Sequence, residues 1–425
     1  MKFGHAFKDA LQGEHYPQHW VEKAIPYRQL KKILGKVREE LIRNGYDPDT
    51  LQRLLEAHDA EYRLWAGDSQ QLQPKLVVRP TLSASALPAT PQESEDEAAC
   101  PITDGQRDAD SCSPVTPKDA EDGWVKIPLN SDSKFFDVLQ TDVTNLDSLQ
   151  NQEQKSMNDN IAVLGTEISE VAKPQKGLIR LSKSDLYRWR EIFELYLAAQ
   201  VFFSTNEASG GGRNSEKAQK QLVWFQDEVT KRQLPHKFKL EASTAAYSRF
   251  LALNATLLQN LQFQELNQTA VTKIIKKFDK QTSLGIKSEF PKVIHSSSFI
   301  AENIAKNICA QLSSEVLGRV PQILDYTCTI CLAICWLPIR LDCSHIFCIR
   351  CMIKMQNRNK ETCPLCRAKT VLLATEEHID MDLVRFLERW FPKETKEKQK
   401  YNEIERRKEL LGEHYAENTG PCTMM

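Results

Sequence analysis

Residues 328–367 read CTICLAICWLPIRLDCSHIFCIRCMIKMQNRNKETCPLCR. Seven of these cysteines and the histidine follow the order Cys-x2-Cys, eleven residues, Cys-x-His-x2-Cys-x2-Cys, eleven residues, Cys-x2-Cys. A Cys-x2-Cys pair fits a tight turn that directs two thiolates at one tetrahedral zinc ion. Eight ligands fill two such sites and leave no open position, so any zinc here is structural. The predicted ligands are Cys328, Cys331, Cys343, His345, Cys348, Cys351, Cys363 and Cys366.

The position of the histidine separates this pattern from other zinc modules. It is the fourth of the eight ligands, and in this respect the segment resembles the RING-finger family. The resemblance implies a cross-brace, in which alternate pairs share a metal. One zinc ion would then be held by Cys328, Cys331, Cys348 and Cys351, and the other by Cys343, His345, Cys363 and Cys366.

The same resemblance implies a surface for a ubiquitin-conjugating enzyme. Ile330 and Pro364 match the family's contact positions in the two outer loops, and Arg367 matches a cation that stabilises the reactive conjugate with ubiquitin. Met355 stands where many members carry a tryptophan, and we expect its adaptable apolar side chain to occupy the same groove. The implied activity is ubiquitin transfer by positioning, without a covalent step on this chain.

Composition sets further bounds on the protein. The chain has 425 residues, a hydrophobic fraction of 41% and a formal net charge of -1, so an anion site must come from local clustering of cations. We find no secretory signal and no apolar stretch of spanning length, and therefore expect a cytoplasmic protein with nuclear or membrane-peripheral pools possible. Clustered cysteines in a reducing compartment are more often metal ligands than disulfides.

Helical periodicity dominates outside the zinc segment, so the predicted fold class is mainly α. Residues 1–72 are expected to be helical, and a Ser-, Pro- and acid-rich insertion at 74–130 is expected to be disordered. Further helices are expected in this order: 135–171, 186–203, 215–229, 244–266, 269–280, 299–320 and 382–411, the last interrupted by Pro392.

Four lysines lie on one face of the expected helix at 269–280. Lys273, Lys276, Lys277 and Lys280 follow the spacing i, i+3, i+4 and i+7. Like charges on one stripe repel one another, and a multiply charged anion would relieve that repulsion. Taken alone, the stripe is also typical of an ordinary solvated face.

The N-terminal residues favour the first interpretation. The opening MKFG, the run IPYRQLKK at 25–32 and the helix LNQTAVTKIIKKFDK at 266–280 resemble the SPX-domain family. That resemblance implies a helical bundle that binds inositol polyphosphates or pyrophosphates. The implied ligand contacts are Lys2, Tyr27, Lys31, Lys273, Lys276, Lys277 and Lys280.

The expected plan is an SPX domain at 1–298 with a helical insertion at 172–240, a connecting helix at 299–325, the RING finger at 326–370 and a charged helical tail at 371–425. Together the two resemblances imply a ubiquitin ligase that links phosphate status to the ubiquitination of targets such as phosphate transporters. A non-catalytic phosphate-sensing scaffold is the alternative. Nucleic-acid binding is not expected, because the overall charge is not basic and no basic recognition helix lies beside the zinc ligands.

Overall fold

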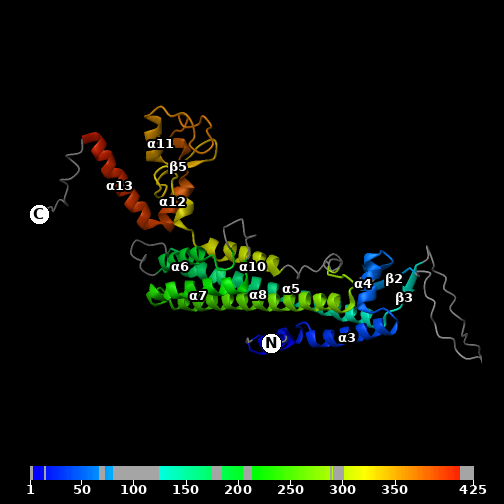
Figure 1. Ribbon diagram of the computed structural model, residues 1–425. Helices are drawn as coiled ribbons and strands as arrows, with labels where there is room; N and C mark the ends of the chain where they lie inside the picture. The colour runs from blue at the N-terminus through cyan, green and yellow to red at the C-terminus, as the bar shows by residue number, and fades with distance from the viewer. Residues whose placement is uncertain are drawn as a thin grey trace, which may run out of the picture. The chain divides into compact units, whose positions relative to one another are not determined.

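The computed structural model of the chain is mostly helical (Figure 1), as expected. It describes residues 3–13, 16–66, 72–79, 124–174, 184–203, 213–287, 290 and 301–411. The chain divides into two compact units. The first comprises 1–153 and 259–303, and the second comprises 154–258 and 304–425. Two long helices, α5 (Asn130–Ala172) and α8 (Glu241–Thr282), contribute residues to both.

The first unit combines helices with a small antiparallel sheet of order β1-β2-β3. Its core is aromatic and aliphatic and includes Leu34, Phe136 and Phe278, all fully buried. Glu40 caps the start of α5, because its carboxylate accepts the N–H groups of Asn130 and Ser131 at 2.8 Å each. The remaining elements are α1 (Phe3–Gly13), α2 (Gln18–Glu22), α3 (Tyr27–Arg43), α4 (Pro48–Glu56), β1 (Ala60–Ala66), β2 (Leu72–Val78) and β3 (Val125–Ile127).

This sheet corrects the sequence prediction at both ends of the insertion. Residues 60–66 were expected to be helical, and most of β2 and all of β3 lie within the range 74–130 that was expected to be disordered. Leu76 and Val78 alternate toward the core, and Leu76 pairs with Ile127, so these ends bury apolar surface. The prediction of disorder between them, at 80–123, lies outside the described residues.

The second unit holds the helical insertion and the zinc-ligand segment. Its elements are α6 (Leu186–Ala199), α7 (Ser215–Lys231), η3 (Pro235–Lys237), α10 (Ala301–Glu315), η5 (Leu317–Arg319), η6 (Ile323–Tyr326), β4 (Pro338–Arg340), β5 (Ile346–Cys348), α11 (Ile349–Gln356), η7 (Glu376–His378), α12 (Met381–Trp390) and α13 (Pro392–Leu411).

Two helix boundaries differ from expectation. The helices expected at 244–266 and 269–280 are one helix, α8, since no residue between them breaks it. The connecting helix expected over 299–325 ends at Glu315, and two short 3-10 turns around Gly318 and Pro321 follow. The break at Pro392 is confirmed, because α12 ends at Trp390 and proline begins α13, where its missing N–H is tolerated.

A close helix contact in the second unit involves α5 and α10. A Cβ atom placed on Gly165 would lie 2.2 Å from the carbonyl oxygen of Glu315. Real Cβ contacts are never so short, so only glycine permits this approach of the two backbones.

Arg190 of α6 joins both flanks of the zinc-ligand segment. This buried guanidinium donates to the carbonyl oxygen of Pro321 through Nε and to that of Trp390 through Nη2, both at 2.8 Å. Its Cζ lies 3.9 Å from the centre of the Phe391 ring. Neighbouring Tyr187 donates to Glu394 at 2.9 Å. We call this group the Arg190 clamp.

Within the described residues, no helix combines the length and the apolarity needed to cross a membrane.

Candidate functional site

Two turns of the same design present the outer cysteine pairs. In the first, the N–H of Leu332 donates to the carbonyl of Cys328 at 2.8 Å, and in the second, the N–H of Arg367 donates to the carbonyl of Cys363 at 2.9 Å. Leu332 and Arg367 both adopt left-handed backbone angles, with φ values of 54° and 64°. In each turn, the hydrogen bond is formed by the residue that follows the second ligand. The turn thereby places the two sulfur atoms on the same side.

The eight predicted ligands form two groups of four, paired as the cross-brace requires. One contains Cys328, Cys331, Cys348 and Cys351, and the other contains Cys343, His345, Cys363 and Cys366, with the ligand atoms of each group within 4.8 Å of one another. Nδ1 of His345 is buried and has no hydrogen-bond partner among the described residues. An unpaired buried nitrogen is costly unless a metal or a donor satisfies it, so the residues fit two structural zinc ions.

The surroundings of the two groups differ in ways that the spacing did not predict. Three ligands of the first group are buried, whereas Cys366 of the second is exposed. The ammonium of Lys398, on α13, donates to the sulfur of Cys331 at 3.4 Å. Sequence reasoning missed Lys398, because it lies far along the chain in a helix that reads as uniformly charged.

A groove runs between the two outer zinc turns. It has a volume of about 600 Å³, and Ile330, Met355 and Pro364 all line it. Ile330 is 40% exposed, whereas Met355 is 9% exposed and closes the floor. The exposed Leu365 and the cation Lys354 also line the groove and were not predicted. Arg367 is exposed and follows the last ligand, two residues beyond Leu365.

The two other cysteines of the described chain offer no nucleophile. Cys335 is buried beside the first zinc group and belongs to neither set of ligands. Cys309 is distant in sequence, and burial raises the pKa of its thiol to about 12. A thiol with so high a pKa is almost entirely protonated near neutral pH.

The predicted anion site lies in the first unit. Lys31 of α3 is exposed, as are Lys273, Lys276 and Lys280 of α8, and Lys277 is partly buried. His5, Arg28, Gln29, Lys31 and Lys32 line a surface hollow of about 650 Å³. His5, Arg28 and Lys32 were not among the predicted ligand contacts. Lys2, which was predicted, lies outside the described residues.

Tyr27 connects these cations through an aromatic cluster. It is 8% exposed, its ring lies 5.0 Å edge-on from that of Phe3, and burial raises the pKa of its phenol. The ammonium of Lys273 lies 4.6 Å from the centre of the Phe3 ring. Gly4 passes over Tyr27 closely enough that an added Cβ would lie 3.4 Å from the tyrosine ring. Most of Tyr27 therefore packs, and it orients α1 and α8 around the start of α3.

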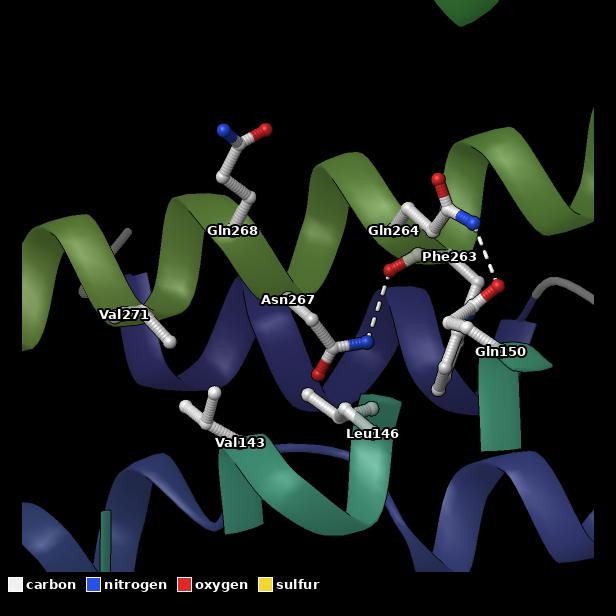
Figure 2. Close-up of a pocket in the computed structure, with 8 residues that line it drawn as sticks. All are labelled: Val143, Leu146, Gln150, Phe263, Gln264, Asn267, Gln268 and Val271. Atoms are coloured by element: carbon white, nitrogen blue, oxygen red, sulfur yellow. Dashed lines mark hydrogen bonds between the residues drawn. The ribbon is translucent and has the colours of Figure 1, made fainter. Parts of the chain in front are cut away.

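Figure 2 shows a small cavity just before the lysines on α8. Its volume is about 30 Å³, roughly that of one water molecule, so no polyphosphate can enter. Gln264 donates to Gln150 across it at 2.5 Å. Asn267 accepts the backbone N–H of Ile25 at 2.9 Å. Asn267 thus fixes the residues that lead into Tyr27, the Gln264 bond joins α8 to α5, and a polyanion would have to bind at the surface.

Comparisons with known proteins find matches to both ends of the chain. The SPX-domain family model matches residues 1–294, and that of the C3HC4-type zinc finger (RING finger) matches residues 328–366. The chain is 32% identical to an uncharacterised RING finger protein of Schizosaccharomyces pombe, across 95% of this chain and 96% of that protein. It is 31% identical to transcriptional regulator of yeast form adherence 3 of Candida albicans, across 96% and 97%.

A plant protein is similar over a shorter stretch. The probable E3 ubiquitin-protein ligase BAH1-like of Arabidopsis thaliana is 27% identical over 29% of this chain and 50% of that protein. No solved structure matches the chain. The matches over nearly the full length agree with the two-zinc geometry and the helical first unit. The chain therefore belongs to the family of fungal proteins that join an N-terminal SPX domain to a C-terminal RING finger.

Proposed function

We propose that this protein is a RING-type ubiquitin ligase whose SPX domain binds inositol polyphosphates or pyrophosphates. The observation that carries the first half is the groove between the two zinc turns, with Ile330 and Pro364 on its walls and Met355 beneath. An apolar groove on a rigid zinc-held frame suits a ubiquitin-conjugating enzyme. The name of the Arabidopsis relative supports the same activity.

In this mechanism the chain acts by orientation. The groove binds the charged conjugating enzyme, and Arg367, held at the tip of the second turn, contacts ubiquitin and restrains the thioester. An ordered thioester is attacked more readily by a lysine amine, because orientation removes part of the entropic barrier. The thioester stays on the conjugating enzyme, in accord with the protonated Cys309 thiol.

The test is discharge of a ubiquitin-charged conjugating enzyme to free lysine. Ile330→Ala and Arg367→Ala should each slow discharge by about tenfold or more, since each removes a contact worth roughly 1.4 kcal/mol or above in the reactive complex. Leu372→Ala and Lys369→Ala are matched controls, because both side chains are exposed and lie outside the groove lining. Unchanged discharge in both test variants, or no discharge by the wild type with any conjugating enzyme, would favour the non-catalytic scaffold.

The lysines around Tyr27 carry the second half of the proposal. They come from α3 and α8 and are exposed apart from the partly buried Lys277, and exposed lysines reach phosphates as flexible point charges. Lys273→Ala combined with Lys276→Ala and Lys277→Ala should abolish inositol hexakisphosphate binding in calorimetry. Alanine at Lys217, Lys220 and Lys231 of α7 removes equal charge elsewhere and should leave binding intact. Equal loss in the two triple variants would show a nonspecific charge effect.

The link between the halves is that ligand binding alters ligation. Occupied lysines no longer repel, which stabilises the end of α8, and coupling of this kind commonly amounts to about 5–150-fold. We expect ubiquitination of membrane-transporter tails, phosphate transporters among them, to change with inositol pyrophosphate in the cytoplasm. The triple lysine variant should ligate at a rate that does not respond to ligand, and an equal response in both proteins would refute the link.

Nucleic-acid binding is not favoured, although one relative is named a transcriptional regulator. The helix beside the zinc ligands, α11, carries the cations Arg350 and Lys354. Arg350 pairs with Glu409 at 2.6 Å, and Lys354 pairs with the same carboxylate at 3.5 Å. These charges are already engaged by α13, so they are poorly placed to neutralise a phosphate backbone.

A further inference from the structure

Lys398 is a buried cation at the interface of α13 with the first zinc group. Its side chain is 8% exposed overall, and its ammonium donates to the sulfur of Cys331 at 3.4 Å. It also lies 5.0 Å from the centre of the Tyr401 ring. A lysine is rarely so buried unless a counter-charge accompanies it.

No carboxylate supplies that counter-charge. Lys398 forms no ion pair with an acidic side chain in the part of the chain that the structure describes. Glu394, one helical turn earlier, accepts the hydroxyl of Tyr187 instead. A buried ammonium without a compensating partner is strongly destabilising. Glu394 and Glu397 line the same surface hollow as Lys398, but the acceptor in direct contact with its ammonium is the sulfur of Cys331.

The charges of the two zinc centres fit an ammonium at the first, whereas at the second Sγ of Cys343 lies 3.5 Å from the neutral hydroxyl of Thr370. A Zn²⁺ ion with four thiolates carries a net charge of -2, whereas three thiolates and a neutral imidazole give -1. The four-thiolate group is also the more buried, so less water is available to stabilise its charge. Cys331 is the half-buried member of the group, and the Lys398 ammonium offsets part of the excess negative charge at this edge.

We propose that Lys398 is an outer-sphere residue of the four-cysteine zinc centre, and that its hydrogen bond to Cys331 retains the metal. A donor to a ligating sulfur withdraws electron density, which makes that sulfur a poorer target for protons and electrophiles. Loss of such contacts elsewhere lowers metal affinity by about 10–100-fold. This inference concerns zinc alone and does not depend on ubiquitin transfer.

The α13 helix has a second attachment that does not touch a ligand. Arg350 of α11 donates to the carbonyl oxygen of Asn402 at 3.3 Å and pairs with Glu409. This contact holds the helix in place when the Lys398 ammonium is removed. Substitution of Lys398 therefore tests the hydrogen bond to sulfur separately from the docking of α13.

The experiment measures zinc release from the full chain into a chromogenic chelator. In Lys398→Met, one of the two zinc ions should leave about tenfold faster and the other at the wild-type rate. Lys398→Arg, which keeps a donor, should restore much of the difference. Lys400→Met is the matched control, because it removes an exposed lysine from the same helix.

Cobalt substitution provides a spectroscopic check. The thiolate-to-cobalt charge-transfer band of the four-cysteine site should shift in Lys398→Met and stay unchanged in Lys400→Met. The proposal is overturned if neither zinc ion leaves faster, or if both leave faster to the same extent. It is also overturned if hydrogen exchange shows α13 undocked in Lys398→Met and Lys398→Arg alike, since Lys398 would then act only in packing.

Discussion

The zinc module and the core of the first unit are stabilised by different means. The buried cluster around the zinc ligands contains five cysteines among eleven residues, and little else is large apart from Phe347 and two methionines. Among the described residues, the core of the first unit contains no cysteine and is built from rings such as Phe135, Phe136 and Phe278. Metal coordination takes the place of apolar burial in the small module. The two regions should therefore fail under different conditions.

The largest effect should follow removal of a ligand from the zinc module. Cys343→Ala should unfold the segment around residues 328–371 locally, because structural zinc contributes on the order of 10–16 kcal/mol in small modules. Hydrogen exchange should show lost protection there and unchanged protection in α3. Cys309→Ala removes a half-buried thiol outside both ligand groups and is the control. Loss of protection throughout the chain would erase the distinction between the two regions.

The Arg190 clamp should contribute to the stability of the second unit without contributing to zinc binding. Arg190→Met keeps the bulk but removes both hydrogen bonds, each of which is charge-assisted. We expect a loss of about 2–3 kcal/mol in the unfolding free energy of the second unit, measured by urea denaturation. Zinc content should stay at two ions per chain. Loss of zinc in this variant would show that the module depends on α6 as well as on metal.

In the helical part, stability is limited by packing, and two glycines test this. Gly165→Ala drives a methyl group into the Glu315 carbonyl and should cost about 1–3 kcal/mol despite the better helix propensity of alanine. Gly35 in α3 has nothing within 4 Å of an added Cβ, so Gly35→Ala should stabilise by about 0.5–1 kcal/mol. Thermal unfolding of both variants measures the contrast. Equal shifts of the melting temperature in the two variants would mean that α10 moves away from the added methyl group without loss of stability.

The last effect is a pH dependence confined to the first unit. Burial raises the pKa of Asp132 to about 7, and Tyr62 donates to its carboxyl at 3.2 Å. The folded chain thus holds this proton more tightly than the unfolded chain, where the pKa is near 3.8. The stability that protonation provides is complete below about pH 4 and is lost as the pH rises to about 7. The slope reaches at most about 1.4 kcal/mol per pH unit.

Asp132→Asn isolates this contribution, because the amide does not titrate. The difference in unfolding free energy between wild type and variant should fall between pH 4 and pH 7 in denaturant titrations. A constant difference across that range would place the proton elsewhere. The rate of zinc release should be the same in Asp132→Asn as in the wild type.

Features that depend on residues close together in the sequence were predicted, whereas features that depend on contacts between distant residues were mostly missed. The eight zinc ligands follow from spacing, because two sulfur atoms on one turn must lie close together. Strand β2 was missed because Pro74 reads as the start of the long insertion, and β3 was missed because it has only three residues and pairs with β2 across that insertion. Lys398 escaped notice for the same reason, since its partner is 67 residues away. The packing of Tyr27 against Phe3 likewise depends on tertiary contacts.

The Arg190 clamp also has a consequence for chain entropy. One guanidinium binds the backbone just before the zinc-ligand segment, at Pro321, and just after it, at Trp390. If the metal is lost, the freed residues form a closed loop whose ends remain together. A chain without this clamp would lose the conformational entropy of closing a long loop each time it bound zinc. With the ends already joined, the eight ligands stay at high local concentration, and we expect reloading to be faster than in a chain released at one end.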